Sequence, residues 1–146
     1  MALKVELKPN ERILIGDSVI TNCNQRSWLL IEGTSPILRE KDILTSARAD
    51  TPAKRIYLAI QLMYTSRDPR VHHELYFALV RQITEAAPST WPLVESINNQ
   101  ILTGNLYKGL KVGKKLIAYE EELLQHAKRG ANLPKRGKTN LKPARA

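Results

Sequence analysis

The chain has 146 residues, of which 42% are hydrophobic and 25% charged, and this composition excludes an intrinsically disordered protein. A single cysteine, Cys23, excludes an internal disulfide and fits a reducing compartment. No apolar run reaches the length of a membrane span and the first residues lack a signal-peptide pattern, so we expect a cytoplasmic protein that does not enter a membrane.

The first third of the chain predicts short strands joined by tight turns. Alternating or compact apolar runs place these strands at residues 3–7, 12–15, 18–21 and 27–32. Ile37 and Leu38 indicate a fifth strand. We expect residues 1–48 to form a small antiparallel β-meander or barrel-like unit. Such a unit is too small to be stable alone, so it should pack on helices or on a second copy.

Residues 49–128 change to helical periodicity and predict a bundle of about four helices, which makes the fold class α+β. Asp50 or Thr51 is suited to cap the first helix, with Pro52 at its first position. The predicted helices cover approximately residues 51–63, 69–86, 90–104 and 105–128. Pro88 separates the second helix from the third.

Apolar side chains at helical spacing predict which face of each helix is buried. For the second helix the predicted stripe is Val71, Leu75, Leu79 and Ile83. In the last helix, Gly109 and Gly113 lie four residues apart, which predicts a close contact with another helix. The acidic run Glu120–Glu122 is predicted to be a solvated face or to pair with Lys114 and Lys115, because adjacent helical positions diverge.

The positive charge is unevenly distributed. Residues 129–146 contain six basic and no acidic side chains, which account for six of the nine net positive charges of the chain. We expect this segment to be a basic flexible tail. Two interpretations stay open, because such a tail can attract polyanions without sequence preference or simply remain a solvated terminus.

The residues that carry catalytic chemistry show no recognised pattern. Cys23, His72, His73 and His126 lack the spacing of a metal site, and the chain contains neither a phosphate-binding loop nor a nucleophile motif. We therefore expect no enzyme activity, no cofactor and no bound metal.

Basic residues gather instead in or beside the predicted β part and the first helix. They are Arg12, Arg26, Arg39, Lys41, Lys54 and Arg55. Such side chains contact RNA phosphates and bases, but an ordinary charged surface also carries them. Trp28 and Tyr57 lie nearby as stacking platforms, or alternatively as a core residue and a helix contact. Lys54 and Arg55 oppose the helix dipole in the first turn, which indicates an anionic ligand or an acidic neighbour.

Several sequence blocks resemble the FlbT family, the flagellin post-transcriptional regulators of flagellated α-proteobacteria. The blocks are Leu3-Lys-Val-Glu-Leu-Lys-Pro9, Glu11-Arg-Ile-Leu-Ile-Gly16, Ile31-Glu-Gly33, Pro36-Ile-Leu-Arg-Glu-Lys-Asp-Ile-Leu44 and Ala49-Asp-Thr-Pro-Ala-Lys-Arg-Ile-Tyr-Leu-Ala-Ile-Gln-Leu-Met-Tyr64. The resemblance covers roughly residues 1–125. It implies binding to the 5′ untranslated leader of flagellin mRNA, an effect on its translation and degradation, and a FlaF-type flagellar regulator as partner. Members either repress or promote flagellin synthesis, so the resemblance leaves the direction of regulation open.

The N-terminal third is also similar to the CsrA family of RNA-binding proteins, through Asn10-Glu-Arg-Ile-Leu-Ile-Gly-Asp17 and Arg39-Glu-Lys-Asp-Ile43. This resemblance implies that Arg39 is the leading RNA contact, supported by Lys4 or Lys8. The paired arginines of that family's first strand correspond here to Leu7 and Lys8, so only one charge is kept.

The sequence thus leads to two hypotheses. In the first, a non-enzymatic repressor or activator binds flagellin mRNA through basic residues at the junction of the β and helical parts. In the second, a protein-interaction module docks FlaF, flagellin or a second copy through apolar helical stripes and the Gly109/Gly113 face, and affects the mRNA indirectly.

Overall fold

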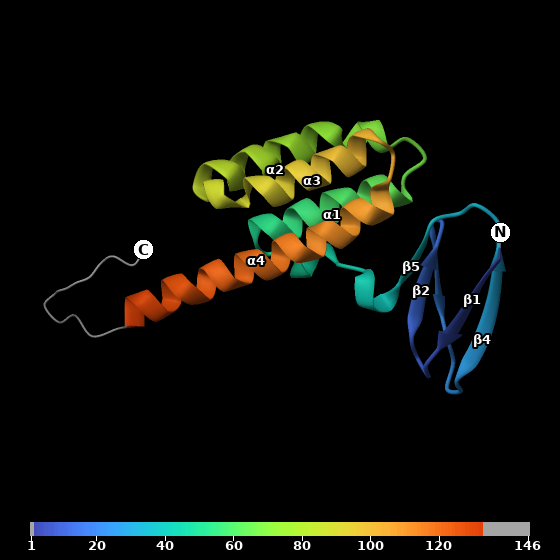
Figure 1. Cartoon of the computed structure of the whole chain (residues 1–146). Helices are drawn as coiled ribbons and strands as arrows, with labels where there is room; N and C mark the ends of the chain where they lie inside the picture. Colours follow the sequence, from blue (N-terminus) through green and yellow to red (C-terminus); the bar gives the residue numbers. More distant parts are fainter. Residues whose placement is uncertain (1, 133–146) are drawn as a thin grey trace, which may run out of the picture.

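The computed structural model describes residues 2–132, in which a β part precedes a bundle of helices (Figure 1). The predicted α+β class is confirmed, because five strands are followed by four α-helices in this part of the chain. Within it, every helix is too short or too polar to cross a membrane.

The strands form two small antiparallel sheets. The strands are β1 (Ala2–Leu7), β2 (Arg12–Ile15), β3 (Ser18–Thr21), β4 (Ser27–Glu32) and β5 (Ile37–Arg39). One sheet pairs β1 with β4, and the other has the order β3-β2-β5. The predicted meander was wrong, because a meander would pair each strand with the next and here β1 pairs with β4. The two sheets are antiparallel, as predicted, and pack against each other.

Alternation along the strands directs apolar side chains to both faces of the three-stranded sheet. Val5, Leu7 and Ile13 are buried together between the two sheets. Leu38 of β5 points the other way and joins the core of the helices, and Leu14, its partner in register on β2, packs against the same core. The outer face of the three-stranded sheet therefore attaches the β part to the bundle.

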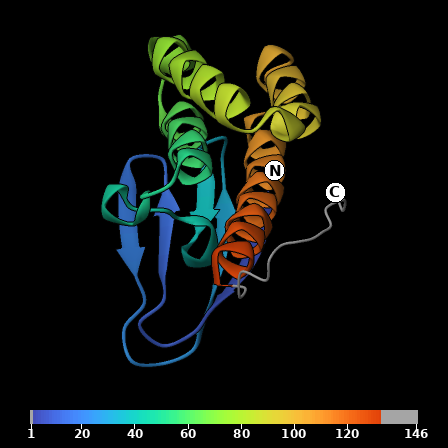
Figure 2. The same ribbon diagram turned by 90° about the vertical axis from the view of Figure 1, so that its left-hand side faces the viewer.

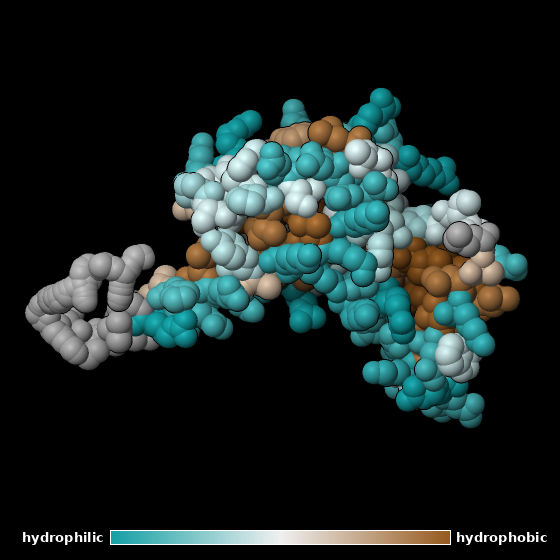
Figure 3. Space-filling model, viewed as in Figure 1, coloured by the Kyte–Doolittle hydropathy of each residue, from teal (hydrophilic) through white to brown (hydrophobic). Residues whose placement is uncertain are grey.

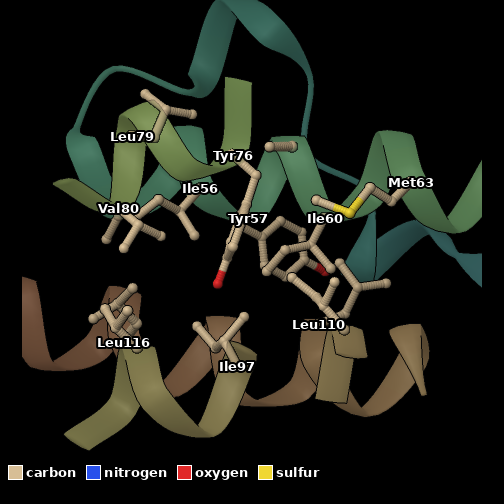
Figure 4. Packing of buried hydrophobic residues seen from close by; sticks show 14 of the residues in the cluster. Ile56, Tyr57, Ile60, Met63, Tyr76, Leu79, Val80, Ile97, Leu110 and Leu116 are labelled. Atoms are coloured by element: carbon tan, nitrogen blue, oxygen red, sulfur yellow. The ribbon is translucent and has the colours of Figure 1, made fainter. Parts of the chain in front are cut away.

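The bundle is built around α1 and α4. The helices are α1 (Pro52–Thr65), α2 (His73–Ala86), α3 (Trp91–Leu102) and α4 (Leu106–Asn132). Short 3-10 turns precede or connect them: η1 (Glu40–Asp42), η2 (Ser46–Arg48), η3 (Pro69–His72) and η4 (Pro88–Thr90). α1 contacts α2 and α4, and α3 packs on α4 (Figure 2). Figure 4 shows side chains from all four helices meeting in one core.

Glycines bring α4 close to another helix, as predicted, and the structure shows that this helix is α1. A Cβ added at Gly113 would lie 3.1 Å from Cδ2 of Tyr57, and one added at Gly109 would lie 3.5 Å from Cγ2 of Ile60. Both glycines are buried in this contact. The Gly109/Gly113 face is therefore occupied within the chain, and the prediction that it docks another protein was wrong.

The buried face of α2 differs from the predicted stripe. Leu79 and Ile83 are buried as expected, but Val71 and Leu75 are 66% and 49% exposed. Tyr76 takes their place in the core, where its hydroxyl lies 2.6 Å from Oδ1 of Asn98 on α3. A hydrogen bond to a distant residue thus orients the start of this helix, and apolar periodicity alone contains no sign of it.

The last helix is longer than predicted. α4 continues to Asn132, so its backbone extends four residues into the segment that was expected to be a flexible tail from residue 129. The rest of the predicted tail, residues 133–146, lies outside the described residues.

Candidate nucleic-acid interface

The basic residues predicted to bind RNA fall into three groups around the junction of the β part and the bundle. Lys8, Arg12, Arg39 and Lys41 lie near one end of the β part, Lys54 and Arg55 lie in the first turn of α1, and Lys4 and Arg26 lie on the outer β1–β4 sheet or beside it. The structure therefore does not unite all eight residues in one patch.

Arg39 connects the two sheets. Its Nη2 donates to the main-chain carbonyl of Glu6 on β1 at 2.9 Å, and the same atom lies 3.8 Å from Oε2 of Glu11. The Nε atom is buried without a hydrogen-bond partner among the described residues. The Arg39 side chain is 42% exposed, so part of the guanidinium still faces solvent while the rest closes the gap between β5 and β1.

The residues around Arg39 are held by two carboxylates. Glu11 Oε1 accepts from the backbone N–H of Lys8 at 2.8 Å, and Glu40 Oε1 accepts from the backbone N–H of Arg12 at 2.6 Å. These contacts use main-chain donors and leave the side chains of Lys8, Arg12 and Lys41 exposed. In the part of the chain that the structure describes, none of these three side chains forms an ion pair.

The first turn of α1 has the acidic neighbour that its basic residues indicated. Glu120 of α4 is 8% exposed, and its Oε2 accepts from the backbone N–H of Ala53 at 3.0 Å. Lys54 also pairs with Asp50 at 3.4 Å. The prediction that Glu120 is solvated was therefore wrong, because it satisfies one of the free N–H groups at the start of α1.

Thr51 caps the same helix end. Its Oγ1 accepts from the backbone N–H of Lys54 at 3.3 Å, and Pro52 follows at the first helical position. Side chains from α4 and from the cap thus satisfy the first turn, while Arg55 stays exposed.

The outer face of the β1–β4 sheet exposes Trp28. This side chain is 60% exposed, so the interpretation of Trp28 as a core residue was wrong. Nζ of Lys4 lies 5.0 Å from the centre of its ring. Arg26 forms an ion pair with Glu6 at 3.1 Å. Positive and negative side chains are mixed on this face, so it is poorly suited to bind the negatively charged backbone of RNA.

Sequence analysis missed a basic surface on α4. Lys108, Lys111 and Lys115 are exposed at helical spacing, and Nζ of Lys111 lies 5.1 Å from the ring centre of Tyr107, which is 40% exposed. We call these four residues the α4 basic surface. The spacing of the lysines was a signal in the sequence, but only the fold shows that they continue from the junction at η1.

η1 is fastened to both central helices. The Asp42 side chain pairs with Lys114 of α4, and the Asp42 carbonyl accepts a hydrogen bond from the hydroxyl of Tyr57 on α1. Tyr57 is the helix contact that one interpretation predicted. Its burial, and then the negative charge of Asp42, raise its pKa well above the usual range. These bonds hold η1 against α4, where Asp42 lines one small cavity together with Tyr107 and Lys111 of the α4 basic surface. Lys41, the residue before Asp42, is exposed.

Comparisons with known proteins complete the description. The family model described as "Flagellar protein FlbT" matches residues 3–124. A protein of Bradyrhizobium diazoefficiens named "Probable flagellum biosynthesis repressor protein FlbT 1" is 64% identical over 124 residues, covering 84% of this chain and 85% of that protein.

More distant relatives cover similar shares of the chain. "Probable flagellum biosynthesis repressor protein FlbT" of Rhodopseudomonas palustris is 53% identical over 124 residues, 85% of this chain and 98% of its own. "Flagellum biosynthesis repressor protein FlbT" of Caulobacter vibrioides is 29% identical over 135 residues, 90% of this chain and 96% of its own. No solved structure matches the chain.

Proposed function

The chain belongs to the FlbT family of flagellar proteins, and we propose that it is a non-enzymatic regulator of flagellum biogenesis that binds the 5′ leader of flagellin mRNA. The names of its relatives support the coarser part of this proposal, regulation of the flagellum, and they favour repression as its direction. RNA binding is supported by the charges and aromatic side chains at the junction.

The observation that carries the proposal is the exposed pair of Tyr107 and Lys111. An aromatic ring with a cation beside it offers a nucleobase a stacking surface and a phosphate an ion pair, and neither contact depends strongly on sequence. Lys108 and Lys115 extend the positive charge along the helix, and Lys41 adds to it from η1. Single-stranded segments of a leader fit this arrangement better than a duplex, because their bases are free to stack.

Binding alone would regulate the message. A protein seated on the leader changes the access of ribosomes and nucleases without performing a reaction itself, so degradation is assigned to a separate nuclease. The basic residues of residues 133–146 add a sequence-independent attraction to the same polyanion.

Variants of the α4 basic surface test this proposal by fluorescence anisotropy with a labelled flagellin leader RNA. Tyr107→Leu should weaken binding about 5- to 150-fold, because stacking on one aromatic side chain contributes about 1–3 kcal/mol. Leucine keeps an apolar contact with Tyr64, whose ring centre lies 5.9 Å from that of Tyr107. Lys111→Ala should reduce the slope of log affinity against log salt by about 0.7, as expected for one lost phosphate contact on a single strand.

The control is Arg81→Ala, which removes an exposed arginine of α2 that belongs to neither the α4 basic surface nor the predicted RNA-binding residues. It should change leader affinity by less than about twofold, because salt screens charges that do not touch the RNA. Equal effects of Tyr107→Leu and Arg81→Ala would assign the binding to general charge and contradict the proposed surface.

Docking of another flagellar protein is the second candidate function, with a FlaF-type regulator or flagellin as the partner. Val71 of η3 and Leu75 of α2 favour it, because these two large apolar side chains are four residues apart and are 66% and 49% exposed. Co-purification of either partner with the wild-type chain, and its loss with Leu75→Asp, would support this function. No RNA binding by the free protein would then make docking the primary role.

A further inference from the structure

An apolar slot lies between β1, β5 and the central helices. Its volume is about 460 Å³, and it opens on the face of the molecule where apolar residues gather beside the bundle (Figure 3). The apolar lining comes from Leu3, Val5, Ile31, Ile37, Tyr64 and Tyr107. Tyr107 of the α4 basic surface lies at its margin, and the slot is also lined by Arg39 and Lys4, which the resemblance to the CsrA family implies as RNA contacts.

One wall of the slot is an open strand edge. In an antiparallel strand, the N–H and C=O of one residue point to the same edge, and those of the next residue point to the opposite edge. Residues two apart therefore share an edge. The Leu7 carbonyl accepts from Asn22 on the side of β4, whereas the Glu6 carbonyl accepts from Arg39 on the opposite side. Lys4, two residues before Glu6, therefore directs its main-chain groups into the slot.

The facing strand is closed. Both main-chain groups of Ile37 on β5 are bonded to the hydroxyl of Tyr64, at 3.3 Å for the N–H and 3.1 Å for the carbonyl. For Lys4, in contrast, the described residues provide no hydrogen-bond partner on the slot side. An added strand would thus pair with β1 and not with β5.

Arg39 supplies the positive charge of the slot, because Nζ of Lys4 lies over the Trp28 ring on the outer face of the β1–β4 sheet. Arg39 also holds a buried Nε without a partner among the described residues. Asp42 also lines the slot, but its carboxylate is paired with Lys114. A ligand with a carboxylate complements this lining.

We propose that this slot binds an extended, acidic segment of a partner protein, which adds as a strand to the open edge of β1. Its backbone pairs with Lys4, a large apolar side chain enters the space between Leu3 and Tyr107, and an aspartate or glutamate faces Arg39. Strand addition gains affinity from main-chain hydrogen bonds and specificity from the pockets for alternate side chains.

Two other occupants fit less well. Residues 133–146 of this chain are basic and contain no acidic side chain, so their charge opposes that of the slot. A second copy would have to pair through the same β1 edge, because an interface between identical copies needs a self-complementary surface. That edge lies inside a slot lined also by β5 and α4, so two such edges cannot easily approach each other.

Selection from phage-displayed random dodecapeptides on the full-length protein tests the proposal, followed by anisotropy of the selected peptides. We expect enriched peptides with a large apolar residue and an acidic residue at alternating positions. Lys4→Pro should weaken their binding about tenfold, because it removes the edge N–H. Lys4→Ala, the matched control, keeps that N–H and should cost less. Proline is tolerated at a strand edge that lacks a partner.

Leu3→Asp gives a second variant that does not depend on the backbone, because Leu3 is 47% exposed and its replacement should not unfold the core. It should abolish selection of the same peptides. Failure to enrich any common peptide, or equal binding by Lys4→Pro and wild type, would overturn the proposal. A dimer in sedimentation that Leu3→Asp dissociates would assign the slot to a second copy, and a loss of leader RNA affinity in Lys4→Pro without peptide selection would assign it to RNA. Both would also overturn it.

Discussion

Glu120 provides the sharpest test of how α4 supports the first helix. The carboxylate is buried, and it accepts the backbone N–H of Ala53 at 3.0 Å. Glu120→Ala leaves that N–H without an acceptor in a buried site, which costs about 1–3 kcal/mol. It also removes a negative charge from the positive end of the α1 dipole, worth about 0.3–1 kcal/mol. We expect the free energy of unfolding to fall by about 2 kcal/mol.

Urea unfolding followed by circular dichroism measures this change, and a loss of about 2 kcal/mol corresponds to about 6 °C in Tm for a chain of this size. The two neighbouring glutamates are matched controls, because Glu121 and Glu122 are exposed on the same helix. Glu121→Ala and Glu122→Ala should stay within about 0.5 kcal/mol of wild type. A Glu120→Ala protein as stable as the Glu121→Ala protein would refute the capping role.

Three further predictions concern the same core. Gly109→Ala should be neutral or stabilise the protein by up to about 1 kcal/mol, because alanine has the higher helix propensity. Gly113→Ala should gain nothing or lose stability, because its added Cβ lies 3.1 Å from the Tyr57 ring. The midpoints of urea unfolding compare the two variants. Tyr57→Phe should cost about 1 kcal/mol by removing the hydrogen bond to η1, and no measurable loss would contradict that bond. Burial raises the pKa values of Tyr57, Tyr64 and Tyr76 above the ordinary 10.0, so the folded state keeps protons that the unfolded chain loses. The free energy of unfolding should therefore be constant just below pH 10 and fall above it. A free energy of unfolding that does not change at alkaline pH would contradict this burial.

Local patterns predicted the elements well. Alternating or compact apolar runs located the five strands, and Pro52 behind a cap at Asp50 or Thr51 located the start of α1, because these signals depend on neighbouring residues only. Gly109 and Gly113 also predicted a close contact of α4 with another helix, but they did not identify that helix as α1.

Features that depend on distant residues were not predictable. The pairing of β1 with β4 joins strands that are separated in the chain by β2 and β3, and the burial of Tyr76 depends on Asn98 from another helix. The same holds for Glu120, which looks like its two solvated neighbours until α1 is placed against α4.

The candidate site likewise combines features that the sequence predicted with features that depend on distant residues. Sequence analysis located basic residues at the junction and inferred an acidic neighbour near Lys54, which is confirmed by Glu120 and Asp50. It did not reveal that Arg39 bridges the two sheets, because its acceptor is a main-chain carbonyl of β1. RNA contact by the predicted residues stays a prediction, and Arg39→Ala would affect stability as well as binding.

One measurement tests the central claim most directly: a salt titration of the purified full-length protein with a flagellin leader RNA, against a scrambled RNA of equal length. Direct recognition of the leader predicts that the preference for it survives near-physiological salt, where non-specific phosphate contacts weaken steeply. Equal affinities that fade together as salt rises would contradict it.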